Sequence, residues 1–307
     1  MDHDPAEHMT CMEVWGGNQA ADNGVVMSGL DAWVYARPYQ EHSAGGDIHY
    51  VSICATGRII RLLVADVSGH GREVAAVAHT LRTLMRRFIN YIDQSSLIRG
   101  LNTEFTRLSE MNCFATAIVA TYWSPTDDLV MSNAGHPRPL WYRARSGEWI
   151  VLDHKTAAAD GPANIPLGIA EPATYDVMAL RLRRGDLVFL YTDSLIEAKG
   201  SDKRQLGEAG LLEIVRALDP ERPEMFIASL LESIRARTGA EFEDDVTALL
   251  LRPNDLKPRA GIGTAMLAGA RIAASAVKSV FGRGPAGLPE VTLRNIGGAM
   301  VGRLNRK

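Results

Sequence analysis

The grouping of strand-like and helix-like segments is the feature that most constrains how this 307-residue chain folds. Short apolar runs rich in β-branched residues predict strands, and apolar residues spaced three and four apart predict amphipathic helices. The predicted order is strands, two helices, strands, two helices and a last strand, at residues 33–35, 48–54, 59–65, 74–92, 95–109, 114–122, 129–133, 139–143, 175–182, 187–191, 206–217, 223–237 and 246–251. Because helices and strands are grouped rather than alternating, the order favours an α+β class with antiparallel sheets.

The charge is unevenly distributed along the chain. Residues 255–307 carry 9 Lys/Arg and 2 Asp/Glu, whereas the rest of the chain carries 24 and 34, so an acidic body precedes a basic tail. With 46% hydrophobic and 22% charged residues, the composition predicts a packed core and excludes collagen-like, largely disordered and disulfide-scaffold proteins. An acidic body also argues against nucleic acid as the partner.

Composition shifts predict three regions. Residues 1–28 lack clear periodicity and are treated as a short N-terminal arm, residues 29–253 as the folded domain, and residues 254–307 as a Gly/Ala-rich tail. Residues 264–281 have the pattern of a basic amphipathic helix, which would lie on an anionic membrane or on a partner, and the alternative is a weakly structured tail. Neither a signal peptide nor a long apolar span is evident, and the dispersed Cys11, Cys54 and Cys113 are typical of reduced packing residues. We therefore expect a cytoplasmic protein.

Aspartates at strand ends are the most informative chemical feature. Asp66 and Asp193 end apolar runs, whereas Asp47 and the pair Asp244-Asp245 stand just before apolar runs. In an antiparallel sheet, the last residue of one strand and the first of its neighbour lie at the same edge, so these sites are expected to converge. Clustered carboxylates need a compensating cation, and oxygen ligands suit Mg²⁺ or Mn²⁺. The alternative for each single aspartate is ordinary turn chemistry.

The segments around these aspartates carry a family resemblance. They are AGGD at 44–47, ADVSGHG at 65–71, NAGHP at 133–137, PLGI at 166–169, GDLVFLYTD at 185–193 and DDVTALLL at 244–251. In this order and spacing, the sequence resembles the metal-dependent PPM/PP2C protein phosphatases, in particular the bacterial SpoIIE/RsbU-like branch, over about residues 31–252. The resemblance implies a four-layer αββα sandwich of two antiparallel sheets flanked by helices.

The resemblance also implies roles for individual residues. Two Mg²⁺ or Mn²⁺ ions would be held at the sheet edge, with Asp66 as the bridging ligand and the Val67 carbonyl on the second ion. Asp193 and Asp244 would bind the first ion, and Asp47 would contribute directly or through water. Asp66 and Asp193 are thus the expected catalytic residues. A water activated by two metals would attack the phosphorus of phosphoserine or phosphothreonine in one step.

Four further residues are open in their roles. Asp245 is expected to support the neighbouring ligands, although either member of the pair 244–245 could be the metal ligand. His70 is either a proton donor or part of a loop that fixes the start of the next helix. Arg37 is either a phosphate contact or a solvated strand end. Ser194 replaces a glycine that is usual in the resembled family, which would alter the loop without removing a ligand.

The NAGHP segment is predicted to have a structural role. Asn133 and His136 are expected to fix a turn between two strands, and Pro137 would prevent further ladder hydrogen bonds. Arg138 next to it would meet either a phosphate or solvent.

The expected function is a protein serine/threonine phosphatase. By resemblance, its substrate would be a phosphorylated STAS-domain anti-sigma-factor antagonist in a partner-switching pathway. The alternative is a pseudophosphatase or scaffold that binds a phosphoprotein without turnover, and a metal nuclease is disfavoured because the body lacks a basic groove. A separate activating partner and a homodimer through the helix at 74–92 are compatible with the sequence, and membrane contact would involve only the tail.

Overall fold

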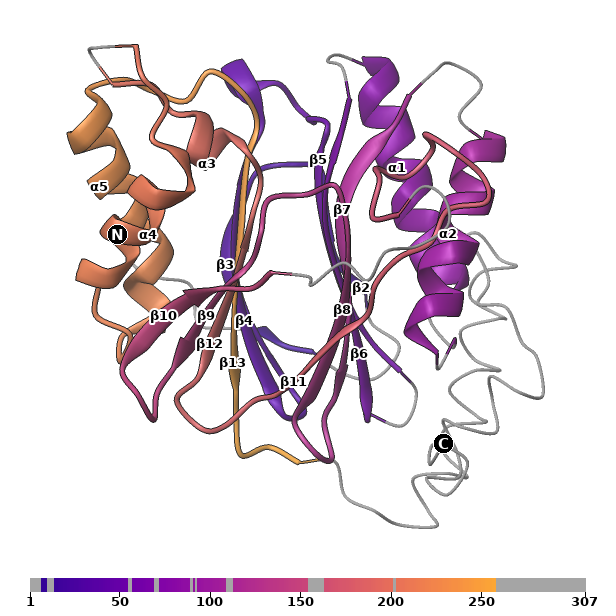
Figure 1. Ribbon diagram of the computed structural model, residues 1–307, viewed down its shortest axis with the longest axis horizontal. Helices are drawn as coiled ribbons and strands as arrows, with labels where there is room; N and C mark the ends of the chain where they lie inside the picture. Colours follow the sequence, from indigo (N-terminus) through magenta and orange to yellow (C-terminus); the bar gives the residue numbers. More distant parts are fainter. Residues whose placement is uncertain are drawn as a thin grey trace.

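The computed structural model describes residues 7–9, 14–54, 57–68, 72–88, 91, 93–108, 113–153, 163–200 and 203–257. Two β-sheets face each other, as Figure 1 shows. The first sheet contains, in spatial order, β1 (Glu7–His8), β3 (Ala21–Met27), β4 (Leu30–Arg37), β13 (Val246–Pro253), β12 (Leu187–Tyr191), β9 (Leu140–Arg143) and β10 (Glu148–Val151). The second contains β11 (Met178–Arg181), β8 (Asp128–Ala134), β7 (Ala115–Trp123), β6 (Ile59–Val67), β5 (Asp47–Ile53) and β2 (Val14–Gly17).

Helices cover the outer face of each sheet (Figure 1). The second sheet is covered by α1 (Arg72–Arg87) and α2 (Gln94–Leu108). The first sheet is covered by α4 (Gly207–Ala217) and α5 (Pro223–Thr238), and the short α3 (Ser194–Glu197) follows β12. A 3-10 turn, η1 (Tyr39–Glu41), follows β4. Pairing is antiparallel throughout the described strands except between β1 and β3, so the predicted αββα sandwich is confirmed.

Three apolar cores hold the four layers together. Successive side chains of a strand point to opposite faces, so a strand inside a sandwich must be apolar on both. In β6, Leu63 and Ala65 pack under the helices while Leu62 and Val64 pack between the sheets. The continuous apolar runs in the sequence therefore mark the central strands of the two sheets.

The structure differs from the predicted elements in four places. Residues 14–27 contain β2 and β3, which are integral strands of the two sheets although their sequence shows no clear periodicity. The helix predicted at 74–92 ends at Arg87. The strand predicted at 175–182 is confined to β11, and β10 and α3 were not predicted. Most of these are short or edge elements, and β3, although longer, lies between β1 and β4; their stability depends on tertiary pairing more than on local pattern.

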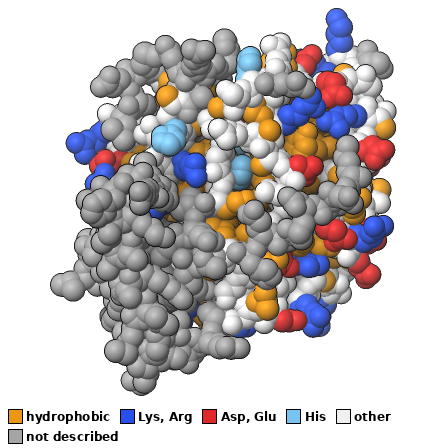
Figure 2. Space-filling model, turned by 180° about the vertical axis from the view of Figure 1, so that it is seen from behind, with side chains coloured by type: hydrophobic (Ala, Val, Ile, Leu, Met, Phe, Trp, Pro, Cys, Tyr) orange, Lys and Arg blue, Asp and Glu red, His pale blue; other side chains and the backbone are white. Residues whose placement is uncertain are grey.

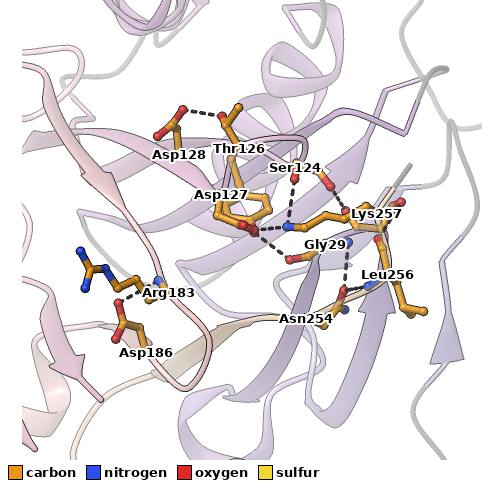
Figure 3. A network of polar contacts seen from close by, with 12 residues as sticks. Gly29, Ser124, Thr126, Asp127, Asp128, Arg183, Asp186, Asn254, Leu256 and Lys257 are labelled. Atoms are coloured by element: carbon orange, nitrogen blue, oxygen red, sulfur yellow. Dashed lines mark hydrogen bonds and ion pairs between the residues drawn. The ribbon is translucent and has the colours of Figure 1, made fainter. Parts of the chain in front are cut away.

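The chain leaves β13 at the end of the sandwich opposite to residues 244–245, and Figure 3 shows a polar network there. The Asn254 side chain accepts from Gly29 N–H at 3.0 Å and donates to Met27 O at 3.0 Å. Lys257 Nζ donates to Ser124 O at 3.1 Å and also pairs with Asp127. The contacts of the folded body thus continue to Lys257, and the helix predicted at 264–281 lies outside the described residues. No helix in the described part of the chain is long and apolar enough to cross a bilayer.

Candidate functional site

The predicted aspartates lie at one edge of the sandwich. Asp47 begins β5 and Asp66 lies next to the end of β6, and the two residues are direct cross-strand partners. In the facing sheet, Asp193 follows β12 and the pair Asp244-Asp245 precedes β13, and these two strands are also paired. Antiparallel pairing therefore brings both sets of strand ends to the same edge, as the sequence predicts.

A hydrogen bond joins the two sheets directly beneath this edge. Thr192 Oγ1 donates to Asp47 Oδ2 at 2.8 Å and accepts from Thr247 N–H at 2.9 Å. All three residues are buried. Thr192 thus fixes the orientation of the Asp47 carboxylate from the opposite sheet. Sequence reasoning missed this role, because it depends on how the two sheets stack, for which the sequence carries no local signal.

Asp245 holds the loop that leads into β5. Its Oδ1 accepts from Tyr39 N–H and its Oδ2 from Gly46 N–H, each at 2.6 Å. A Cβ at Gly45 would lie 2.3 Å from Asp245 Oδ2, and one at Gly46 would lie 2.9 Å from Val67 O, so the loop requires both glycines. With both of its oxygens accepting backbone N–H bonds, the Asp245 carboxylate acts as a positioning group.

Asp244 is placed differently from its neighbour. Its side chain is exposed, and its Oδ1 accepts from the Asp245 N–H at 2.8 Å. The other carboxylate oxygen has no hydrogen bond within the described residues. Asp244 therefore has the freer carboxylate of the pair.

The charged groups that act on one another at this edge are carboxylates. Burial raises the pKa of Asp66 to about 7, and the charges that add to the shift are the carboxylates of Asp193, Asp244, Asp245 and Glu197. Burial and then Asp66 raise the pKa of Asp47 well above its ordinary value, while the Thr192 hydrogen bond opposes the shift. The pKa of Asp193 is also raised, by burial and then by Glu197. These carboxylates repel one another, and a cation among them would relieve the repulsion.

Glu197 was not predicted as part of this cluster. It lies four residues after Asp193, at the end of α3, and this i to i+4 spacing places both side chains on one helix face. The spacing is a sequence signal that could have identified it. Within the described ranges, no three Asp, Glu, His or Cys side chains are arranged to hold a metal ion as they stand. The edge thus gathers carboxylate oxygens of the type that hard cations prefer as ligands, although no three described side chains are already arranged around a metal position.

The remaining predicted residues have these positions. Arg37 ends β4 and its Nη1 lies 3.6 Å from Glu241 Oε2. Val67 ends β6, and its carbonyl oxygen faces Gly46. Ser194 begins α3 without a positive φ, so the backbone does not require glycine there. His70 and Cys11 lie outside the described residues.

The NAGHP segment forms the predicted turn. Asn133 Nδ2 donates to His136 O at 2.8 Å, and His136 N–H donates to Asn133 Oδ1 at 2.7 Å. Burial lowers the pKa of His136 to about 3, so the imidazole is neutral. Arg138 forms ion pairs with Glu208 and with Asp153. Its charge is therefore used in contacts within the fold.

The surface charge bears on the nuclease alternative. Figure 2 shows Lys/Arg and Asp/Glu side chains interspersed over the half of the molecule that carries α4 and α5. A nucleic-acid phosphate backbone is bound by clustered basic residues, and the described part of this face has no such cluster. This face therefore does not favour the nuclease alternative.

Comparisons with known proteins agree with the resemblance. The family model of stage II sporulation protein E (SpoIIE) matches residues 56–254. The phosphoserine phosphatase RsbU of Bacillus subtilis (strain 168) is 21% identical over 194 residues, which are 63% of this chain and 55% of RsbU. The chain therefore spans about half the length of this relative.

Solved structures share the fold. The RsbU and RsbW domains of Rv1364c from Mycobacterium tuberculosis superpose with a TM-score of 0.61 at 22% identity, covering 86% of this chain and 79% of that one. The PP2C phosphatase domain of SpoIIE from Bacillus subtilis gives 0.60 at 15% identity, covering 80% and 64%. The catalytic domain of the serine/threonine phosphatase PstP, solved with two manganese ions, gives 0.51 at 15% identity, covering 74% and 99%.

Proposed function

The chain belongs to the SpoIIE family of PP2C-type phosphatases, and on this premise we propose that it is a metal-dependent protein serine/threonine phosphatase. The observation that carries the proposal is the convergence of Asp47, Asp66, Asp193 and Asp244 from two sheets at one edge of the sandwich, where the pKa of Asp66 is raised to about 7 by burial and by other carboxylates. An edge that concentrates uncompensated negative charge and oxygen donors fits divalent cations. Its chemistry also suits Mg²⁺ or Mn²⁺ better than zinc, because the charged groups that shift the pKa values of Asp47, Asp66 and Asp193 are carboxylates rather than His or Cys.

We assign the metal ligands as the resemblance implies. Asp66 would bridge two ions, the Val67 carbonyl would serve the second, Asp193 and Asp244 would serve the first, and Asp47 would contribute directly or through water. When bound, two such ions supply an activated water and neutralise charge on the phosphoryl oxygens. The hydrogen bonds described above support Asp244 as the ligand and Asp245 as the residue that positions the loop.

The chain's own residues would then orient the reaction. Thr192 keeps the Asp47 carboxylate directed to the edge, and Asp245 holds the glycine turn so that the Gly46 and Val67 backbones stay in contact. Arg37, next to this turn, is the candidate phosphate contact. The role of His70 as a proton donor stays a prediction.

The substrate and the setting are inferred from the relatives. Because the curated relative is a phosphoserine phosphatase, we propose a phosphoserine or phosphothreonine protein, in particular a STAS-domain anti-sigma-factor antagonist in a cytoplasmic partner-switching pathway. A separate activating partner, a homodimer and a tail that contacts partners or membrane remain parts of this proposal. The division into residues 1–28, 29–253 and 254–307 also remains a proposal, and the pairing of β2 and β3 favours an earlier start of the domain.

The experiment that tests the proposal is hydrolysis of p-nitrophenyl phosphate by the full chain with Mn²⁺, with Mg²⁺ and with EDTA. We expect turnover with metal, none with EDTA, and its loss in Asp66→Asn and Asp193→Asn at unchanged folding. Glu148→Gln, at the far edge strand β10, is the matched control and is expected to retain wild-type turnover. Phosphoprotein binding by a folded chain without turnover would instead favour a pseudophosphatase.

A further inference from the structure

A pocket lies beside the acidic edge, at the end of β4. It has a volume of about 470 Å³, and its described lining includes Ala21, Asp22, Tyr35, Ala36 and Arg37. Asp22 and Tyr35 are cross-strand partners in β3 and β4, and Ala21 and Ala36 form the next pair. The pocket is therefore built on the paired backbone of β3 and β4.

The pairing of the strands places the pocket near the acidic edge. Arg37 at its rim is the cross-strand partner of Val246, which directly follows Asp245. The N–H of Tyr39, two residues after Arg37, donates to Asp245 Oδ1 at 2.6 Å. Asp22 lies two strand spacings from β13 and is in register with Ala248, three residues beyond Asp245, so its backbone is roughly 14 Å from that of Asp245, or about four residues of an extended peptide. A peptide with its phosphoserine at the acidic edge can thus place a nearby side chain in the pocket.

The described lining of the pocket contains one carboxylate, that of Asp22, together with Arg37 and His42. Arg37 is paired with Glu241, whereas the exposed Asp22 carboxylate has no hydrogen bond or ion pair within the described residues. Tyr35 is half-buried and lies across from Asp22. Asp22 and Tyr35 share one face of the β3–β4 pair, whereas Ala21 and Ala36 point to the other face. A carboxylate beside an aromatic ring suits a long cationic side chain, because its stem packs on the ring and its head meets the charge.

We propose that this pocket binds a Lys or Arg side chain of the phosphoprotein substrate, two to four residues from the phosphoserine. The inference rests on the proposed phosphatase function and adds a substrate feature to it. Asp22 is then a specificity residue, and the pocket selects among phosphoproteins by a contact that lies outside the metal-binding edge.

The test uses fluorescein-labelled phosphoserine peptides that carry Lys, norleucine or Glu at one position, two to four residues on either side of the phosphoserine. Norleucine keeps the stem of lysine and lacks its charge. For the wild type and for Glu148→Gln, we expect kcat/KM and binding measured by anisotropy to favour Lys over norleucine roughly three- to tenfold at one position, as an exposed ion pair and a cation–π contact allow. In Asp22→Asn this ratio falls toward one, and in Asp22→Lys the Glu peptide becomes the preferred one.

Equal values for Lys and norleucine peptides in the wild type, or a lysine preference that survives in Asp22→Asn, would overturn the proposal. A preference for norleucine would show that the pocket takes an apolar side chain instead. Hydrolysis of p-nitrophenyl phosphate by the wild type separates the two hypotheses: its presence with no lysine preference refutes the pocket alone. Its absence refutes the phosphatase, and the anisotropy ratios still decide whether Asp22 selects a cation.

Discussion

Replacing Thr192 by valine tests whether the hydrogen bond between the sheets organises the site. Valine keeps the shape of threonine but leaves Asp47 Oδ2 without its donor at 2.8 Å and the buried Thr247 N–H without its acceptor at 2.9 Å. A buried unpaired N–H costs about 1–3 kcal/mol, and a lost hydrogen bond to a carboxyl group adds about 1–2 kcal/mol. We therefore expect Thr192→Val to lower the free energy of unfolding by about 2–5 kcal/mol.

Thr192→Ser is the matched control, because it retains the hydroxyl and removes one methyl group, which costs about 1 kcal/mol. Urea unfolding of the metal-free chain measures the stability of both variants, and titration with Mn²⁺ measures metal affinity. Because the Thr192 hydrogen bond lowers the pKa of Asp47, its loss leaves less of the ionised carboxylate available. We expect affinity to fall roughly 10- to 100-fold in the valine variant, as for other groups that orient ligands. Equal stability and equal affinity of the two variants would refute this reasoning.

Three other predictions follow from the described contacts. Gly46→Ala brings a Cβ to 2.9 Å from Val67 O and is expected to destabilise the fold and abolish turnover, whereas Gly100→Ala in α2, with its nearest atom at 3.6 Å, is expected to be neutral or stabilising by up to about 1 kcal/mol in urea unfolding. Because the pKa of His136 is lowered to about 3, its contribution to stability is present above the unfolded value near 6.5 and is lost as pH falls, by about 1.4 kcal/mol per pH unit. His136→Gln should therefore flatten the dependence of stability on pH between 6 and 4, and an unchanged slope would contradict the buried neutral imidazole. Mn²⁺ should raise the melting temperature of the wild type and leave that of Asp193→Asn unchanged, whereas an equal rise in both would place the metal elsewhere.

Much of the fold and the position of the site could be predicted from local pattern. The continuous apolar runs of β6 and β13 mark strands buried on both faces, and carboxylates at their ends mark a common edge because antiparallel pairing fixes which ends meet. Gly45 and Gly46 are readable in the same way, since two successive glycines before an aspartate mark a tight turn, and the structure leaves no room for a side chain against Asp245 at Gly45 or against Val67 at Gly46.

The missed features depend on tertiary contacts. β2 and β3 are strands because β5 and β4 are available to pair with them, although residues 14–27 contain Gly and Asn. The role of Thr192 requires the stacking of one sheet on the other, and the pocket beside Asp22 requires the register of β3 with β4. Neither arrangement leaves a pattern in a single sequence.

Phosphate release from a phosphoserine peptide, measured as Mn²⁺ is added to the metal-free full chain, tests the central claim most directly. Wild type and Glu148→Gln are predicted to gain turnover together as metal binds, and Asp66→Asn is predicted to remain inactive while its urea unfolding shows an intact fold. Turnover that persists in EDTA, or that is the same in Asp66→Asn and wild type, would contradict a metal-dependent phosphatase site at this edge.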